Sequence, residues 1–222
     1  DYIENGDIVG LGTGSTVKYV LEALGKKVQQ GLNILGVATS VQTAQLAKSL
    51  NIPLITLDEV LQGHKVIDIA IDGADQIDES YHMIKGGGGA MHREKIILMC
   101  SDLRIIIVDD SKMVKKLGGA KLPVEVTKFS YLPVMELLKG SGLPSKPRLD
   151  SNGNFFITDN GHYILDCKLP EKPNLDEISA LVSMIPGVVD HGLFMDLASI
   201  IVVGGAEGLK IHEIEEHELS QE

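Results

Sequence analysis

The strongest constraint on the fold is an alternation of strand-like and helix-like segments over residues 7–122. Short apolar runs such as VIDIAIDG (66–73) alternate with segments whose apolar residues recur at helical spacing, such as TVKYVLEALGKKV (16–28). The expected strands are 7–12, 32–39, 53–57, 66–73 and 103–110, and the expected helices are 16–28, 41–50 and 90–100. This β-α-β-α order predicts an α/β protein with a mainly parallel, Rossmann-like sheet covered by helices.

The rhythm changes after Leu122, where a strand and a helix are followed by short strands, a helix and a final strand, in an approximate β-α-β-β-α-β order. This order suggests a small split-βαβ domain of the ferredoxin-like type. Its expected helices are 131–140 and 176–185, and its expected strands are 123–129, 147–150, 155–159, 163–169 and 187–194. The run LASIIVVGGAEGLKI (197–211) is interpreted as a strand, a glycine turn and a strand of the first domain. We therefore expect a Rossmann-like catalytic domain over 1–122 and 197–222, and an inserted α+β domain over 123–196.

Composition argues against several classes of function. The 222 residues carry a formal net charge of −11, which argues against nucleic acid as the main partner because binding phosphates needs a basic face. No apolar run reaches the ~18 residues of a membrane span and no signal peptide is visible, so we expect a cytoplasmic protein without a membrane partner. Cys100 and Cys167 have no metal-binding spacing, so we expect reduced, buried thiols. The chain opens at Asp1, without Met and almost directly on a strand, so we expect a natural N-terminal segment to be missing.

The first motif with chemical meaning is LGTGST (11–16), between an expected strand and an expected helix. Glycines let the backbone approach a ligand, the start of a helix offers free N–H groups, and Ser15 and Thr16 add hydroxyl donors, which suits a phosphate. The motif is not a P-loop, because no GK[ST] follows at the right spacing. It is not a good dinucleotide fingerprint either, because Ser15 stands where glycine is needed. A tight strand–helix turn with Ser or Thr as the N-cap is the alternative.

Two acidic residues follow an apolar strand in IAIDGADQID (69–78). Asp72 and Asp75 are expected at the carboxyl edge of the sheet, where open parallel sheets bind their ligands. Neighbouring carboxylates can hold sugar hydroxyls, exchange a proton or bind a metal. No further ligand completes a metal spacing, so we expect no metal. For Asp78 we prefer a role in capping the next turn.

Four consecutive glycines stand in IKGGGGAMHREK (84–95), directly before an expected helix. They predict a second backbone cradle, with Lys85 at its entrance, that can offer N–H groups to an oxyanion. Glu94 falls within the helix, and its neighbours at i−4, i−3, i+3 and i+4 are all apolar. A carboxylate on such a face is poorly hydrated, which should raise its pKa and make it a stronger base. Alternatively, Glu94 pairs with Arg93 or Lys95, which spacing alone does not exclude.

A further lysine, Lys112, follows two acidic residues at the end of IIIVDDSK (105–112). Taken alone, it is interpreted as a surface lysine. Taken together, four strand ends present phosphate donors, two acids, two lysines and a glutamate. This convergence is harder to explain by structure alone than any single motif, and it predicts a functional site.

The motifs LGTGST, DGAD, KGGGGA-x-x-REK and VDDSK, with KLPVEV (121–126) and HGLF (191–194), closely resemble those of type A ribose-5-phosphate isomerases. The resemblance covers nearly the whole chain, in the same order. It implies that Glu94 is the catalytic base and that Asp72, Asp75 and Lys85 assist it. The substrate-binding residues that it implies are Thr13, Gly14, Ser15, Thr16, Asp72, Gly73, Ala74, Asp75, Lys85, Gly86, Gly87, Gly88 and Lys112.

The implied reaction interconverts D-ribose 5-phosphate and D-ribulose 5-phosphate through an enediolate, in the non-oxidative branch of the pentose phosphate pathway. Glu94 would move a proton between C2 and C1, while Lys85 and the glycine N–H groups would face the oxyanion. Asp72 and Asp75 would open the furanose ring or shuttle hydroxyl protons, and their tasks stay undivided. No cofactor is expected, and the expected partners are the sugar phosphate and further copies of the chain, in a homodimer or homotetramer.

Two other functions are weighed against this one. A non-enzymatic sugar-phosphate sensor, of the kind fused to DNA-binding domains in repressors, needs the phosphate loop but no poised base, so Glu94 and Lys85 argue against it. A coenzyme A transferase-like enzyme would use a glutamate as nucleophile, and kinetics with an acyl-CoA donor would identify it.

Overall fold

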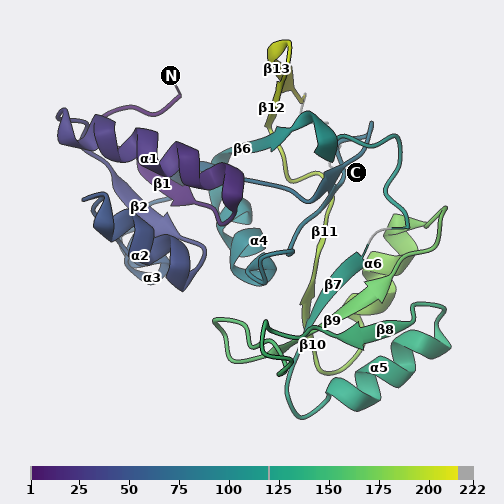
Figure 1. Ribbon diagram of the computed structural model, residues 1–222. Coiled ribbons are helices and arrows are strands. Elements are labelled where there is room, and N and C mark those ends of the chain that lie inside the picture. Colours follow the sequence, from purple (N-terminus) through teal and green to yellow (C-terminus); the bar gives the residue numbers. More distant parts are fainter. Residues whose placement is uncertain (1, 120, 215–222) are drawn as a thin grey trace, which may run out of the picture. The chain divides into compact units, whose positions relative to one another are not determined.

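The computed structural model describes residues 2–119 and 121–214, and its contacts divide the chain into two compact units (Figure 1). The first unit comprises Asp1–Gly73, Ile97–Ser111 and Leu197–Glu222, and the second comprises Ala74–Ile96 and Lys112–Asp196. Each unit has a hydrophobic core of its own.

A six-stranded sheet forms the centre of the first unit, in the order β13-β12-β6-β3-β1-β2. Every neighbouring pair is parallel except β12 with β13. The strands are β1 (Ile8–Leu11), β2 (Leu35–Ala38), β3 (Ile67–Asp72), β6 (Ser101–Asp109), β12 (Ile200–Gly205) and β13 (Gly208–Glu213). The predicted α/β class, with a mainly parallel Rossmann-like sheet, is confirmed.

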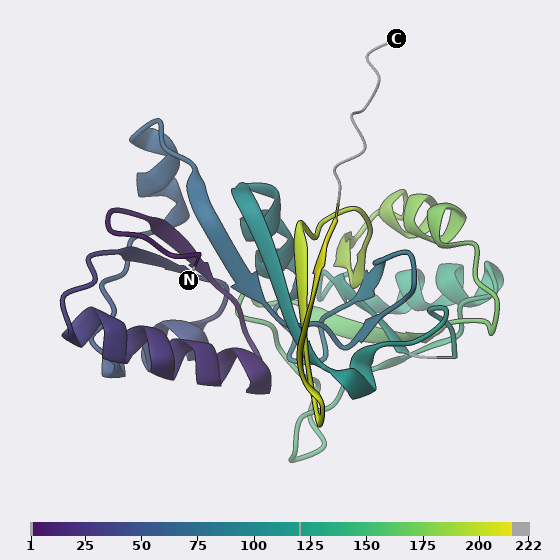
Figure 2. The same ribbon diagram turned by 90° about the horizontal axis from the view of Figure 1, so that it is seen from above.

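Helices α1 (Ser15–Gln29) and α2 (Val41–Ser49) bury their apolar faces against this sheet, and Figure 2 shows α1 running beside it. The other face receives the end of α4 (Met91–Met99) at Gly10 of β1. A Cβ at Gly10 would lie only 2.7 Å from Cγ2 of Ile97, so glycine allows the helix to approach the strand closely. The core consists of Val9, Leu11, Val17, Leu21, Leu24, Ile34, Ala47, Ile52, Ile69, Ile105 and Ile200.

A capping box begins α3 (Leu57–Gln62) and explains one wrong prediction. The Thr56 hydroxyl accepts a hydrogen bond from the Glu59 N–H, and the Glu59 carboxylate accepts one from the Thr56 N–H. The helix therefore begins inside the segment 53–57, which was expected to be a strand. Only a single parallel bridge, between Gly36 and Leu54, forms there.

The second unit contains a four-stranded antiparallel sheet in the order β10-β7-β9-β8. Helices α5 and α6 lie beside it, and their buried residues share one core with the sheet (Figure 1). The elements are β7 (Lys121–Val126), α5 (Tyr131–Gly140), β8 (Ser145–Pro147), β9 (Tyr163–Lys168), α6 (Leu175–Ser183) and β10 (Val188–His191). This β-α-β-β-α-β arrangement is the predicted ferredoxin-like one.

Two details of this unit differ from the predictions. The segment 155–159 is not a strand, because Phe155 forms only an isolated bridge with Leu149. The Asp150 carboxylate accepts N–H groups from Asn152 and Asn154, and this turn occupies the segment that leads to 155–159.

A small three-stranded sheet also belongs to the second unit, in the order β11-β5-β4. Its strands are β4 (Gln76–Ile77), β5 (Met83–Ile84) and β11 (Leu193–Phe194). Because β5 pairs with β11, residues 74–96 pack with the second unit, and so do residues 112–122. The sequence pattern alone groups both segments with the first domain, because pairing between strands far apart in the chain leaves no local signal.

Candidate active site

Asp72 organises the predicted site residues of the first unit, at the end of β3. Its side chain is buried, and Oδ1 accepts hydrogen bonds from the N–H groups of Thr13 (3.1 Å) and Gly73 (2.8 Å). A Cβ at Gly12 would lie 2.2 Å from the same oxygen, so only glycine fits there. The carboxylate thus holds together the loops that follow two adjacent parallel strands, β1 and β3.

The Thr13 side chain turns into a cluster of hydroxyl groups. Its Oγ1 lies 2.7 Å from Thr39 Oγ1, 2.7 Å from Ser40 Oγ and 3.0 Å from Thr43 Oγ1. The Ser40 hydroxyl also caps α2 by accepting the Thr43 N–H. Sequence reasoning missed these three residues, which fix the conformation of the LGTGST loop.

The helix that follows this loop begins without a side-chain cap. Gly14, with φ of 147°, occupies the N-cap position of α1, and no side chain of the described residues accepts a hydrogen bond there. Ser15 is exposed and Thr16 is half-buried. Because Gly14 occupies the N-cap position, the alternative of a Ser or Thr cap is wrong. A helix N-terminus with N–H groups that no side chain caps and with adjacent hydroxyls favours an anion, which supports the phosphate interpretation.

Lys85 and Glu94 form the most unusual feature of the second unit. Lys85 Nζ lies 3.5 Å from Glu94 Oε2, and the two side chains are only 2% and 5% exposed. Burying two charges costs several kcal/mol for each ion, so stability alone is a poor reason for this pair. The prediction placed Glu94 on a poorly hydrated face, and its burial confirms that.

The neighbours of Glu94 in the sequence have other partners. Arg93 donates to the Asn160 side chain (2.7 Å) and to the Asp159 carbonyl oxygen (3.0 Å). Lys95 forms an ion pair with Asp190. These partners favour the interpretation of Glu94 as a poorly hydrated base over a simple pairing with Arg93 or Lys95.

The glycine loop needs its glycines for steric reasons. Gly86 and Gly89 have φ of +106° and +82°, which side chains rarely tolerate. A Cβ at Gly87 would lie 2.7 Å from the Asp75 carboxylate. The Gly89 N–H donates to the Gly86 carbonyl oxygen and closes a turn directly before α4.

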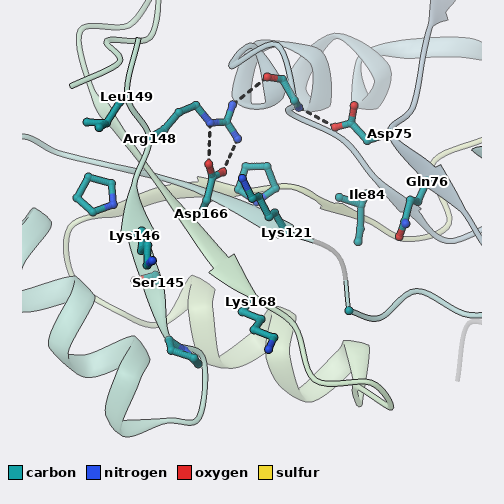
Figure 3. A pocket seen from close by; sticks show the side chains of 15 residues that line it. Asp75, Gln76, Ile84, Lys121, Ser145, Lys146, Arg148, Leu149, Asp166 and Lys168 are labelled. Carbon is teal, nitrogen blue, oxygen red and sulfur yellow. Dashed lines mark hydrogen bonds and ion pairs between the residues drawn. The ribbon is translucent and has the colours of Figure 1, made fainter. Parts of the chain in front are cut away.

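Two side chains hold this loop through its backbone (Figure 3). The Asp75 carboxylate accepts the Gly87 N–H at 2.7 Å. Arg148 Nη1 donates to the carbonyl oxygens of Gly86 (2.7 Å) and Gly87 (3.0 Å). Asp75 was predicted, whereas Arg148 was not, because nothing in the segment 147–150 distinguishes it from an ordinary strand arginine.

The aromatic ring of Phe194 lies close to Lys85 and to a second lysine, Lys95. The Phe194 ring has Lys85 Nζ 5.5 Å and Lys95 Nζ 4.8 Å from its centroid. Lys95 also donates to the His191 carbonyl oxygen at 2.6 Å. Burial lowers the pKa of Lys95, while Asp190 acts in the opposite direction. Sequence reasoning missed Lys95 and Asp190.

His191 is buried and neutral. Burial, and then the charge of Lys95, lower its pKa to about 4, against the opposing effect of Asp190. Its Nδ1 accepts the Leu193 N–H, so its proton resides on Nε2, which lies 3.2 Å from a serine hydroxyl on either side. A histidine that already carries its proton on Nε2 is unsuited to activate these serines, and we interpret it as structural.

The predicted residues thus fall into two groups, one in each unit. Thr13, Gly14, Ser15, Thr16, Asp72 and Gly73 lie in the first unit, and Ala74, Asp75, Lys85, Gly86, Gly87, Gly88, Glu94 and Lys112 lie in the second. Direct contacts join Asp72 to Thr13 and Gly73, Asp75 to Gly87, and Lys85 to Glu94. Lys112 ends a short 3₁₀ helix, Asp110–Lys112, and is half-buried.

Over residues 2–119 and 121–214, no three His, Cys, Asp or Glu side chains are grouped so that they could hold a metal ion. No helix within those same ranges has the length and apolar character needed to cross a bilayer.

An α/β protein with a buried carboxylate–ammonium pair beside a backbone cradle belongs to the class of enzymes equipped for proton transfer on a small ligand. The chain matches the model of the family described as ribose 5-phosphate isomerase A (phosphoriboisomerase A) over residues 35–208. The protein belongs to that family.

Individual relatives agree. The chain is 44% identical over 208 residues to ribose-5-phosphate isomerase A of Listeria innocua, covering 94% of this chain and 91% of that protein. It is 44% identical over 220 residues to the probable ribose-5-phosphate isomerase 2 of Arabidopsis thaliana, covering 95% and 82%. A solved D-ribose-5-phosphate isomerase in complex with phospho-erythronic acid superimposes with a TM-score of 0.90 at 37% identity, covering 96% of this chain and 93% of that one.

Proposed function

We propose that this protein is an aldose–ketose isomerase that interconverts D-ribose 5-phosphate and D-ribulose 5-phosphate in the non-oxidative branch of the pentose phosphate pathway. The observation that carries the proposal is the buried pair of Glu94 and Lys85, 3.5 Å apart, in a chain of this family. A base that is shielded from water and held beside a cation suits the removal of a carbon-bound proton.

Glu94 is the proposed base. Its carboxylate takes the proton from C2 of the open-chain aldose, and the electron pair of the C–H bond forms the C1=C2 bond of an enediolate. A proton also moves from the O2 hydroxyl to O1, and the same carboxylate returns its proton to C1, which yields the ketose with its carbonyl at C2. The proton is transferred within one molecule, so the reaction is redox-neutral and we propose no cofactor.

Lys85 and the glycine loop are the proposed donors to the oxyanion. An ammonium group stabilises the enediolate oxygen more than the neutral carbonyl oxygen, which is the condition for lowering the barrier. That a related isomerase binds phospho-erythronic acid supports this role, because the carboxylate of such an acid resembles the charge of an enediolate. We propose that Gly86, Gly87 and Gly88 contact the sugar through their backbone.

The two aspartates open the furanose ring or carry hydroxyl protons in this proposal. Asp75 is exposed and can exchange protons with solvent, whereas Asp72 is buried and already accepts two N–H groups. These environments favour Asp75 for proton exchange and Asp72 for holding Thr13 and Gly73 in place.

The phosphate group is assigned to the loop at the start of α1, and Lys112 is proposed separately as a substrate-binding lysine. Gly14 leaves the first N–H groups of α1 without a side-chain acceptor, and Ser15 and Thr16 offer hydroxyls beside them. A dianionic phosphate suits such a helix start.

We further propose a homodimer or homotetramer in the cytoplasm. Large apolar side chains on the second unit support association between copies, since Phe129 is 98% exposed and Met184 is 82% exposed. Light scattering after size-exclusion chromatography tests this, and a mass of one chain, 23.9 kDa, would contradict it.

The activity is tested by following ribulose 5-phosphate formation from ribose 5-phosphate in a buffer that contains EDTA. Turnover is expected, because the proposed oxyanion donors are an ammonium and N–H groups. Turnover that stops with the chelator and returns with a divalent ion would refute this mechanism. The comparisons give no support to a sugar-phosphate sensor or to a coenzyme A transferase.

A further inference from the structure

We propose that Arg148 is a positioning residue that aims the backbone of the glycine loop at the reacting part of the substrate. This inference rests on the function proposed above. It starts from the fact that the loop has no side chains of its own, so its shape depends on what holds its peptide groups. Arg148 holds two of them in succession, by donating from Nη1 to the carbonyl oxygens of Gly86 and Gly87.

The orientation of the loop follows from the planar peptide bond. In a trans peptide the C=O and the following N–H point in opposite directions. In the first peptide, Arg148 holds the Gly86 C=O and Asp75 holds the Gly87 N–H, so both ends are occupied. In the second, Arg148 holds the Gly87 C=O, so the Gly88 N–H points away from the guanidinium.

The Gly88 N–H is the group that this arrangement leaves available to a ligand. Among the hydrogen bonds of residues 2–119 and 121–214, none uses the Gly88 N–H as a donor. Gly88 is exposed, so a ligand can reach it. A donor that is fixed before the substrate arrives needs no reorganisation when negative charge develops. Arg148 would therefore act on catalysis through Gly88 without touching the substrate.

The chemistry of arginine suits this task better than that of lysine. The Arg148 fork donates from Nε and Nη2 to the two oxygens of Asp166 (Figure 3), while Nη1 donates to the carbonyl oxygens of Gly86 and Gly87. Both side chains of this ion pair are 14% exposed. A lysine ammonium could neutralise Asp166, but it is a compact charge without a planar fork and cannot reproduce all four hydrogen bonds.

The strand register explains how the arginine reaches the loop. Arg148 directly follows Pro147, the end of β8, and its N–H donates to the Ile164 carbonyl oxygen of β9. Asp166 lies two residues further along β9, on the same face of the sheet. The guanidinium is thereby fixed on this face, in a cavity of about 1020 Å³ that is also lined by Asp75 and Gly87 (Figure 3).

This cavity makes a chemical rescue experiment possible. The variant Arg148→Ala should lose about 10²-fold in kcat, the usual effect of losing one oxyanion donor, with a much smaller change in KM. Free guanidinium at tens of millimolar, well below denaturing concentrations, should enter the vacated space and restore kcat by about tenfold. Methylammonium at the same concentration should not, because it lacks the planar fork.

The matched control is Lys146→Ala. Lys146 lines the same cavity from β8 and is exposed, and no hydrogen bond links it to the glycine loop in the described part of the chain. This variant should keep the wild-type kcat and should not respond to guanidinium. An equal loss in both variants would assign the effect to the general charge of the cavity.

Hydrogen exchange of the loop amides gives a readout that is independent of turnover. Amides of residues 84–91 should exchange faster in Arg148→Ala, and guanidinium should slow them again. If the wild-type enzyme does not turn over ribose 5-phosphate, the proposed function fails while exchange still decides whether Arg148 orders the loop. If Arg148→Ala does not fold, Arg148→Lys replaces it, with the same expected loss of kcat and faster exchange.

Besides an equal loss of kcat in Arg148→Ala and Lys146→Ala, three results would overturn the proposal. One is a kcat within about threefold of wild type in Arg148→Ala, or in Arg148→Lys if the alanine variant does not fold. The second is restoration by methylammonium as effective as that by guanidinium, which would show that charge alone matters. The third is unchanged exchange of the loop amides, which would show that Arg148 does not order the loop.

Discussion

Glu94 and Lys85 lose most of their hydration on folding, and this mutual burial dominates the site at the scale of single residues. Each charge stabilises the other, because removing one partner of a buried pair typically costs about 3–5 kcal/mol. Replacement of either residue therefore changes both stability and chemistry. Experiments at this scale must compare the transition state with the ground state rather than follow activity alone.

The variant Lys85→Met separates these effects. Methionine keeps much of the apolar stem, but it leaves the enediolate without the ammonium, so kcat should fall by ~10²–10³-fold. Inhibition by a five-carbon phosphorylated aldonate should weaken in parallel, because that inhibitor carries the negative charge. Binding of a sugar phosphate with an uncharged head group should hardly change. Equal weakening of all ligands would make Lys85 a general binding residue instead.

His191 supplies a prediction about pH and stability. Its pKa is about 4 in the folded protein against 6.5 for the free side chain, so the unfolded chain binds more protons between these values. The free energy of unfolding should therefore be fully supported above pH 6.5 and should fall as the pH is lowered toward 4, by at most roughly 3 kcal/mol from this group.

Urea unfolding at a series of pH values measures this effect. The variant His191→Gln should flatten the dependence between pH 4 and 6.5, since it removes the titrating group. The control His64→Asn changes an exposed histidine whose φ of +52° an asparagine tolerates. If both variants keep the wild-type slope, His191 is not the source of the acid sensitivity.

At the scale of the elements, both backbone loops present N–H groups where a strand leads into a helix. The first precedes α1 and the second precedes α4. Glycine is required in each by a close approach to a carboxylate, Gly12 to Asp72 and Gly87 to Asp75. The same two carboxylates then accept N–H groups from the loops, so the acids predicted to do chemistry also shape the backbone.

The start of α1 yields a prediction about binding. The double variant Ser15→Ala/Thr16→Ala should raise KM for ribose 5-phosphate by about 10-fold or more, because each hydroxyl donates to a charged group, while kcat should fall less. Its melting temperature should hold, since alanine favours helix at these positions. Ser151→Ala, an exposed hydroxyl in the second unit, is the control. A fall in kcat without a change in KM would move the loop to the reacting carbons.

Sequence patterns identified the residues whose neighbours carry a signal. The apolar neighbours of Glu94 predicted its burial, and the strand before Asp72 predicted its place at the sheet edge. The sequence did not predict the contacts of Arg148, Asp166 and Lys95, because each of these residues binds a partner distant in the chain. Local turn chemistry caused the errors at 53–57 and 155–159, where capping and turn contacts replaced the expected strands.

At the scale of the whole molecule, the two fold types were predictable and the grouping of segments was not. The change in the order of strands and helices after Leu122 correctly predicted a second architecture, the four-stranded antiparallel sheet with two helices. The grouping of residues 74–96 with it depends on the pairing of Leu193 with Ile84, which no local pattern reveals. As a result the motif DGAD, read as one unit in the sequence, is divided between the two parts after Gly73.

The most direct test of the central claim compares wild type with Glu94→Gln in one isomerase assay. The account predicts that wild type turns over ribose 5-phosphate in EDTA. Glutamine keeps the size of the side chain but cannot accept the proton, so kcat of the variant should be lower by ~10²–10⁴-fold. Binding of ribose 5-phosphate, measured by calorimetry, should stay near the wild-type value. A variant that keeps most of its kcat, or a wild-type protein without isomerase activity, would contradict the account.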